Sequence, residues 1–358
     1  MNRRNLLLQA ICLPETLSAL SLADWDMLLR QARHATLLAH IGALLARHGL
    51  LERVPAPARE HIAWAEVVAQ RHRHAVRWEV RQIRQALETV GVPVILLKGA
   101  AYAMGDLAPA DGRLFSDIDI LVPKSSLNQV EAALMLHGWT GTHHDPYDQR
   151  YYRTWMHELP PMQHIKRQTV IDVHHAILPE SASVRPDPEK LRAAACLLEG
   201  NAELRVLAPV DMVLHSATHL FYEAEPDHGL RDLVDLDGLL RQFGALPAFW
   251  SALAERAQEL QLTRPLFYAL RYTSRILHTP VPAEVMAAAR GGAPNRLTLP
   301  LMDWVYRHVF DAPHPSQTGW RLAIANGLLY VRGHWLRMPP LLLARHLLHK
   351  AFMSPDHE

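Results

Sequence analysis

The chain has 358 residues, of which 49% are hydrophobic, and its formal net charge is +1. This length allows one large or two to three small domains, and the balanced charge gives no global field that would favour nucleic acid or an acidic partner. The two cysteines, Cys12 and Cys196, fit neither a zinc site nor a disulfide framework, so a cytoplasmic protein is expected. No stretch reaches the ~18 uninterrupted apolar residues of a spanning helix.

The N-terminal part is predicted to be helical. Between residues 15 and 90, apolar residues recur at three- and four-residue spacing in two long patterns. The first ends at Gly49 and the second at Gly91, as expected for glycine just past a helix end. The second pattern is long and heavily charged on one face.

The hydrophobic period changes after Gly91, where short apolar runs alternate with helical patterns. Such runs, bounded by proline and glycine, are typical of buried strands. The expected elements are strands in 92–99, 114–123, 157–165 and 168–177, with helices in 99–107 and 125–139. The stretch "KRQ" is expected to form a hairpin turn between the last two strands.

From residue 186 onward the chain is predicted to be helical again, punctuated by prolines. The expected architecture is an α+β fold with an α/β core in residues 91–185. A helical N-terminal region (1–90) and a helical C-terminal region (186–358) would flank that core.

Two aspartates, Asp117 and Asp119, lie one residue apart inside the apolar strand "LFSDIDILVP". Alternate strand residues point to the same side, so the two carboxylates project together while Ile118 and Ile120 face the core. Like charges held so closely are tolerated when a cation lies between them, and hard oxygen ligands suit Mg²⁺. The alternative is a solvated pair at a strand end or a loop cap.

Lys98 and Gly99 stand where the first strand meets the following helix. Free backbone N–H groups at such a junction attract anions, and glycine lets a phosphate approach the backbone closely. Lys98 would add a point charge suited to phosphate.

A third carboxylate, Asp172, occupies the middle of the predicted strand "TVIDVHHAI", with His174 on the same face. A buried aspartate is costly unless it is paired or binds metal. If this strand lies beside the Asp117 strand, three carboxylates converge, which is enough for two metal ions that activate a hydroxyl and stabilise a leaving phosphate.

These elements together resemble the nucleotidyltransferase superfamily with the fold of DNA polymerase β, which has a mixed sheet. The chain looks most like a poorly characterised bacterial nucleotidyltransferase family with an "LKG" element, an arginine before "SDIDLLV" and a later acid-hydrophobic-histidine element. Here these are Leu97–Gly99, Arg113, Ser116–Val122 and Asp172–His174, and the resemblance covers roughly residues 90 to 240.

The resemblance implies transfer of a nucleoside monophosphate from a nucleoside triphosphate to an acceptor, with release of pyrophosphate. It implies Asp117, Asp119 and Asp172 as catalytic ligands of Mg²⁺ or Mn²⁺. His174 is a possible accessory residue because it shares a strand face with Asp172. The nucleotide-binding residues that the resemblance implies are Lys98, Gly99, Arg113 and Ser116. Arg113 could instead form a structural salt bridge. The better-known members have Gly-Ser or Gly-Gly where this chain has Lys98–Gly99, which leaves catalytic activity open.

The acceptor class remains open among small molecules, saccharides, proteins and RNA. One alternative function is a nucleotide-binding module with little turnover that acts through its helical arms. The basic, amphipathic segment 320–352 permits contact with an anionic membrane surface, although packing against the core is the default expectation.

Another alternative is a metal-dependent hydrolase that uses the histidines between 143 and 228. His215 and His219 have the spacing of two ligands on one helix, and His228 follows, but chance pairs are expected among 23 histidines. The pairs His143–His144 and His174–His175 are similar. Asp232, Asp235 and Asp237 are interpreted as part of a solvated helix surface.

Overall fold

The computed structural model describes residues 5–142, 152–153, 155–201, 203–225, 227–311 and 319–338. The pair His143–His144 and residues 339–352 of the predicted membrane-contacting segment lie outside these residues.

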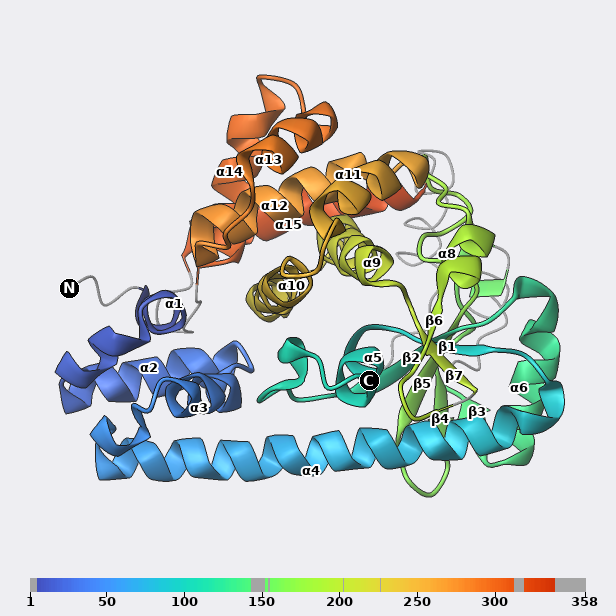
Figure 1. The fold of residues 1–358 in the computed structure, drawn as a ribbon, viewed down its shortest axis with the longest axis horizontal. Helices are drawn as coiled ribbons and strands as arrows, with labels where there is room; N and C mark the ends of the chain where they lie inside the picture. Colours follow the sequence, from blue (N-terminus) through green and yellow to red (C-terminus); the bar gives the residue numbers. More distant parts are fainter. Residues whose placement is uncertain are drawn as a thin grey trace.

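The N-terminal region is helical, as predicted. It contains α1 (Leu6–Cys12), α2 (Leu22–His34), α3 (Leu38–Arg47) and α4 (Ala56–Leu87). A capping box starts α2, in which the Ser21 side chain accepts from the Asp24 N–H and the Asp24 carboxylate accepts from the Ser21 N–H. Helix α4 spans 32 residues and runs beneath both the other N-terminal helices and the sheet (Figure 1).

One mixed sheet of seven strands forms the centre, in the order β3-β4-β5-β2-β1-β7-β6. Its inner strands β5 and β2 are parallel, whereas β2 and β1 are antiparallel. The expected α+β class is therefore confirmed. The strands are β1 (Val94–Leu96), β2 (Asp117–Leu121), β3 (Trp139–Gly141), β4 (Met162–His164), β5 (Val170–His174), β6 (Cys196–Leu197) and β7 (Leu204–Val206).

Three of these strands correct the sequence analysis. Strand β3 was not predicted, and its first residue, Trp139, was expected to end a helix. Strands β6 and β7 lie in the segment that was expected to be helical, and β7 pairs in parallel with β1. The prediction failed there because strands of two and three residues are too short to show a period.

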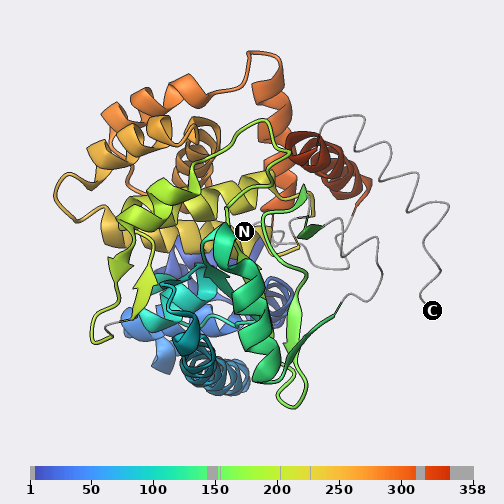
Figure 2. The same cartoon turned by 90° about the vertical axis from the view of Figure 1, so that its right-hand side faces the viewer.

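Helices connect and flank the strands. Helices α5 (Lys98–Met104) and α6 (Leu127–Leu136) pack against β2 and β3, respectively. The C-terminal helices α11–α15 lie above the sheet and α4 lies below it, whereas α2 and α3 lie beside the sheet in Figure 1 and α9 and α10 lie below the other C-terminal helices (Figures 1 and 2). The C-terminal helices are α8 (Pro188–Ala194), α9 (Pro209–Tyr222), α10 (Gly229–Phe243), α11 (Phe249–Glu259), α12 (Thr263–Leu277), α13 (Ala283–Ala289), α14 (Thr298–Val309) and α15 (Trp320–Arg337). Short 3-10 helices lie at Pro14–Ala19, Leu51–Arg53, Glu88–Val90, Ala108–Ala110, Lys124–Ser126 and Arg290–Gly292.

Two contacts join the N-terminal helices to the sheet region. Glu79 of α4 is buried and pairs with Arg167 in the turn between β4 and β5, with a nitrogen–oxygen distance of 2.7 Å. Gly112 has a φ of +70°, and a Cβ there would lie 2.3 Å from the backbone nitrogen of His40 in α3. Only glycine allows this approach, which fixes the loop that carries Arg113.

Helix α15 packs only part of its surface. Ala325 and Leu329 are buried, whereas Trp320, Val331 and Trp335 are exposed. In the described parts of the chain, each helix is too short or too polar to cross a bilayer. Contact of this segment with a membrane surface stays a prediction.

Candidate functional site

The two predicted acidic strands are neighbours. Strands β2 and β5 pair in parallel, with Asp119 opposite Asp172 and Asp117 opposite Val170. Ile118 and Ile120 are buried, as the alternation predicted. One ligand atom from each of Asp117, Asp119 and Asp172 lies within 4.8 Å of the others. The predicted convergence of the three carboxylates is therefore confirmed as geometry.

Asp119 is the best neutralised of the three. Its Oδ1 accepts hydrogen bonds from Lys98 Nζ and His174 Nε2, each at 2.9 Å. Burial would raise the pKa of Asp119, but Lys98 and His174 outweigh burial and hold the pKa well below its usual range. Because both donors use Oδ1, the second carboxylate oxygen is left for a cation.

Asp172 has the opposite environment. Its Oδ1 is buried and finds no hydrogen-bond partner among the described residues. Burial, followed by repulsion from the Asp119 carboxylate, raises the pKa of Asp172 to about 7. An orphaned carboxylate oxygen beside two other carboxylates fits a divalent cation, because hard oxygen ligands are those that Mg²⁺ and Mn²⁺ prefer.

Lys98 is held in an unusual conformation at the start of α5. Its φ is +41°, a backbone conformation that residues other than glycine rarely adopt. The Lys98 side chain is 20% exposed and points to Asp119. In this structure the lysine therefore neutralises a predicted metal ligand, and its contact with a triphosphate stays a prediction.

A cavity of about 180 Å³ opens beside these residues. All four predicted nucleotide-binding residues line it, together with Asp117 and Asp119. Ser116 Oγ donates to Asp117 Oδ1 at 2.7 Å. The other lining residues are Tyr102, Phe115, Ser216, His219, His228, Arg231, Asp232 and Asp235.

Arg113 forms the salt bridge that sequence analysis held open. Its guanidinium pairs with the buried carboxylate of Asp235 in α10 and lies 5.6 Å from the centre of the Tyr102 ring. The arginine still lines the cavity, so this pairing leaves a phosphate contact open.

The interpretation of the α10 aspartates as a solvated surface was wrong for Asp235, which is 6% exposed. Asp232 also lines the cavity and accepts hydrogen bonds from Arg231. Their helical spacing resembles that of an ordinary charged helix face. Only the packing of α10 against the rest of the fold turns that face inward.

Sequence analysis also missed Glu158. An isolated antiparallel bridge sets Glu158 opposite His174, and the Glu158 carboxylate lies 3.2 Å from His174 Nδ1. His174 is thus held between Asp119 and Glu158. Burial lowers the pKa of His174, but the two carboxylates outweigh it and raise the pKa above its usual value.

The helical histidines considered for a hydrolase do not form a metal site with one another in the described part of the chain. His215, His219 and His228 belong to no cluster of metal-ligating side chains in the part of the chain that the structure describes. His215 is buried in α9, where burial lowers its pKa to about 3. His219 and His228 line the cavity instead.

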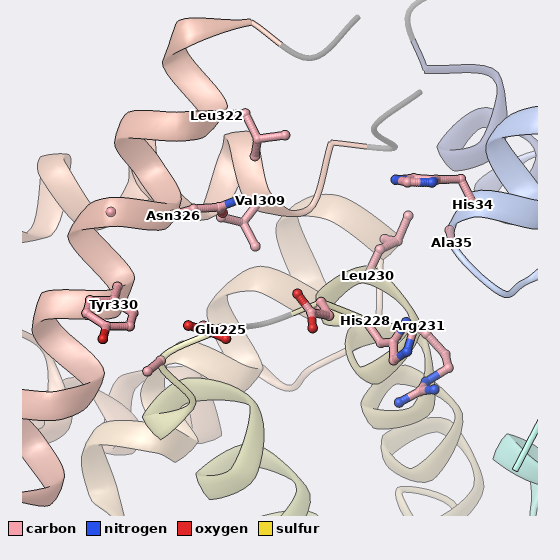
Figure 3. Close-up of a pocket in the computed structure, with 14 residues that line it drawn as sticks. His34, Ala35, Glu225, His228, Leu230, Arg231, Val309, Leu322, Asn326 and Tyr330 are labelled. Carbon is pink, nitrogen blue, oxygen red and sulfur yellow. The ribbon is translucent and has the colours of Figure 1, made fainter. Parts of the chain in front are cut away.

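A second, larger cavity of about 600 Å³ adjoins the first and shares His228 and Arg231 with it. Figure 3 shows its walls: Glu225, His228 and Arg231 lie on one side, Asn326 and Tyr330 of α15 face them, and His34 comes from the N-terminal region. The N-terminal region, the residues around His228 and helix α15 therefore meet around this hollow.

Comparison with known protein families agrees with the resemblance. Residues 21–278 match the family described as "Uncharacterised nucleotidyltransferase". A solved structure, the antigenic nucleotidyltransferase-like protein from Paracoccidioides brasiliensis, is 13% identical and matches 60% of this chain and 96% of its own, with a TM-score of 0.28. No protein with a curated description matches. Because the family match covers more than half of the sequence, the chain belongs to this nucleotidyltransferase family.

Proposed function

We propose that the protein is a metal-dependent nucleotidyltransferase that moves a nucleoside monophosphate from a nucleoside triphosphate to a hydroxyl-bearing acceptor. The observation that carries this proposal is the meeting of Asp117, Asp119 and Asp172 beside a cavity that Lys98 and Gly99 also line. Family membership supports the same class of reaction.

Each residue has a distinct part in the proposed reaction. Asp117, Asp119 and Asp172 would hold Mg²⁺ or Mn²⁺, which would neutralise phosphate charge and make the hydroxyl more acidic. Lys98 and Arg113 would face the triphosphate, and Ser116 would hold Asp117 in place. The acceptor oxygen would form a bond to the α-phosphorus as the bond to the pyrophosphate oxygen breaks. Asp172, which lies beside the other two carboxylates, would help to activate the hydroxyl and accept its proton.

We place the acceptor in the larger cavity. The smaller cavity, of about 180 Å³, lies at the carboxylates, whereas the adjoining one offers about 600 Å³ and polar groups from the N-terminal region, the residues around His228 and α15. Binding sites for small molecules usually have volumes of roughly 300–1,000 Å³. The shared residues His228 and Arg231 would stand between acceptor and triphosphate.

The function is tested by incubating the protein with each labelled nucleoside triphosphate, Mg²⁺ and a panel of small-molecule, saccharide, protein and RNA acceptors. We expect pyrophosphate release that requires an acceptor and is lost when Asp117→Ala and Asp119→Ala are combined. Transfer that survives the double substitution would disprove the assignment. Calorimetric binding of triphosphate without pyrophosphate release would favour a binding module.

The placement of the acceptor is tested by filling the larger cavity. Gly327 lines it, and a Cβ at this position would meet no atom within 4 Å. Gly327→Trp should therefore leave binding of triphosphate with Mg²⁺ intact and abolish transfer. Gly291→Trp, at an exposed glycine with equally open surroundings, is the control. Loss of triphosphate binding in Gly327→Trp but not in Gly291→Trp would indicate that the nucleoside binds in this cavity instead.

A further inference from the structure

A second group of metal-ligating side chains lies on the far side of His174 from the aspartates. One ligand atom from each of His157, Glu158 and His174 lies within 4.8 Å of the others. The group is formed by the segment around Glu158, which runs antiparallel to the end of β5. The Leu159 N–H bonds the Val173 carbonyl at 2.9 Å, and the His175 N–H bonds the His157 carbonyl at 2.8 Å.

The hydrogen bonding of these side chains is incomplete. Nδ1 of His157 and Nδ1 of His174 are both buried, and neither has a hydrogen-bond partner among the described residues. Buried polar atoms are usually satisfied, so two orphaned imidazole nitrogens beside one carboxylate call for an occupant. A proton on His174 could satisfy that ring through Glu158, but His157 would stay unsatisfied. A single cation would satisfy all three groups.

The tautomer of His174 agrees with a metal ligand. Its Nε2 lies 2.9 Å from Asp119 Oδ1, so Nε2 carries a proton, whereas Nδ1 faces Glu158 and would bind a cation in place of a proton. Metal-bound histidines usually donate their other ring N–H to a carboxylate in this way. Bond lengths of about 2.0–2.1 Å and a tetrahedral angle separate two ligand atoms by about 3.3 Å. The His174 Nδ1–Glu158 distance is 3.2 Å.

We propose that His157, Glu158 and His174 form a binding site for a transition-metal dication of the Zn²⁺ class, separate from the aspartate cluster. Two imidazole nitrogens and one carboxylate oxygen favour such an ion over Mg²⁺, which prefers oxygen ligands alone. Three protein ligands leave a fourth position for water. The Glu158 side chain is 17% exposed, so solvent reaches the site. The proposal does not depend on the proposed transferase function.

The test is Zn²⁺ titration of the chelator-treated full chain by calorimetry, with Co²⁺ absorption to report the ligand geometry. We expect tetrahedral Co²⁺ bands in the wild type, and a loss of Zn²⁺ affinity of at least about tenfold in His157→Gln and in Glu158→Gln. Asp117→Asn, which alters the aspartate cluster without touching His174, is the control and should retain this site.

Two outcomes of the Zn²⁺ titration would overturn the proposal. One is that calorimetry detects no bound Zn²⁺ whose affinity depends on His157. The other is Zn²⁺ binding that Asp117→Asn abolishes and His157→Gln leaves unchanged, which would place the ion among the aspartates. If either histidine-site variant fails to fold, electron spin-echo spectroscopy of Cu²⁺-loaded wild type decides, because imidazole nitrogen gives a distinct modulation. Absence of that modulation would also overturn the site.

Discussion

Asp119 and Asp172 are direct register partners on the parallel strands β2 and β5. Yet Asp119 has two hydrogen-bond donors on one oxygen, whereas Asp172 Oδ1 has none among the described residues. The pKa of Asp119 is therefore lowered, and burial raises the pKa of Asp172 to about 7. One carboxylate is ready to bind a cation at any physiological pH, and the other must first lose a proton.

The first prediction concerns the pH dependence of metal binding. Because Asp172 binds a cation only after deprotonation, the affinity for Mg²⁺ should increase as pH rises through about 7. A single proton lost at that pKa makes the affinity about tenfold higher at about pH 8 than at about pH 6. Calorimetry with Mg²⁺ measures this. Asp172→Asn should bind Mg²⁺ more weakly, and its affinity should not rise with pH in this way. An unchanged rise of affinity with pH in the variant would assign the proton to another group.

The second prediction concerns stability without metal. Because the pKa of Asp172 in the fold exceeds its ordinary value of 3.8, the folded protein holds this proton more tightly than the unfolded chain. The stability that this proton supports is present at low pH and is lost as pH rises from about 4 to about 7. In the presence of a chelator, the melting temperature of Asp172→Asn minus that of the wild type should therefore be larger at about pH 8 than at about pH 5. An equal difference at both pH values would contradict this.

The third prediction concerns Lys98. Lys98→Met leaves the carboxylate of Asp119, 4% exposed, with His174 as its one remaining side-chain donor among the described residues, so the metal-free protein should lose about 3 kcal/mol of stability. Mg²⁺ should raise the melting temperature of this variant more than that of the wild type, because a cation would replace the missing positive charge. Thermal unfolding with and without Mg²⁺ measures both effects.

The control for Lys98 is another lysine in an ion pair. Lys124 pairs with Glu180 at the surface, where both side chains are more than half exposed. Lys124→Met should cost less than about 1 kcal/mol and should show no extra response to Mg²⁺. Equal responses of the two variants would mean that Lys98 does not balance the charge of the metal site.

Much of the site could be predicted because strand periodicity fixes side-chain direction locally. The spacing of Asp117 and Asp119 established that they share a face, and a lone aspartate inside an apolar strand pointed to Asp172. Glu158 could not be found in this way, because its partnership with His174 depends on an isolated bridge between segments. Asp235 was misread for a related reason: helical spacing shows which residues share a face but does not show what that face packs against.

The final prediction concerns Gly99, whose φ does not require glycine. A Cβ at this position would lie 3.0 Å from Phe115 Cδ1 and 3.4 Å from Arg113 Nε. Gly99→Ala should therefore fold, since the Phe115 side chain can shift by a few tenths of an ångström, but it should push both side chains toward the cavity that they line. Calorimetry should show weaker triphosphate binding, whereas the melting temperature should change little.

Gly291→Ala is the matched control for Gly99, since a Cβ there meets no atom within 4 Å and Gly291 does not line the cavity. It should leave triphosphate affinity unchanged. If Gly99→Ala also bound triphosphate like the wild type, the phosphates could not lie against the start of α5. Their position would then have to be sought nearer Arg231 and His228, where the two cavities join.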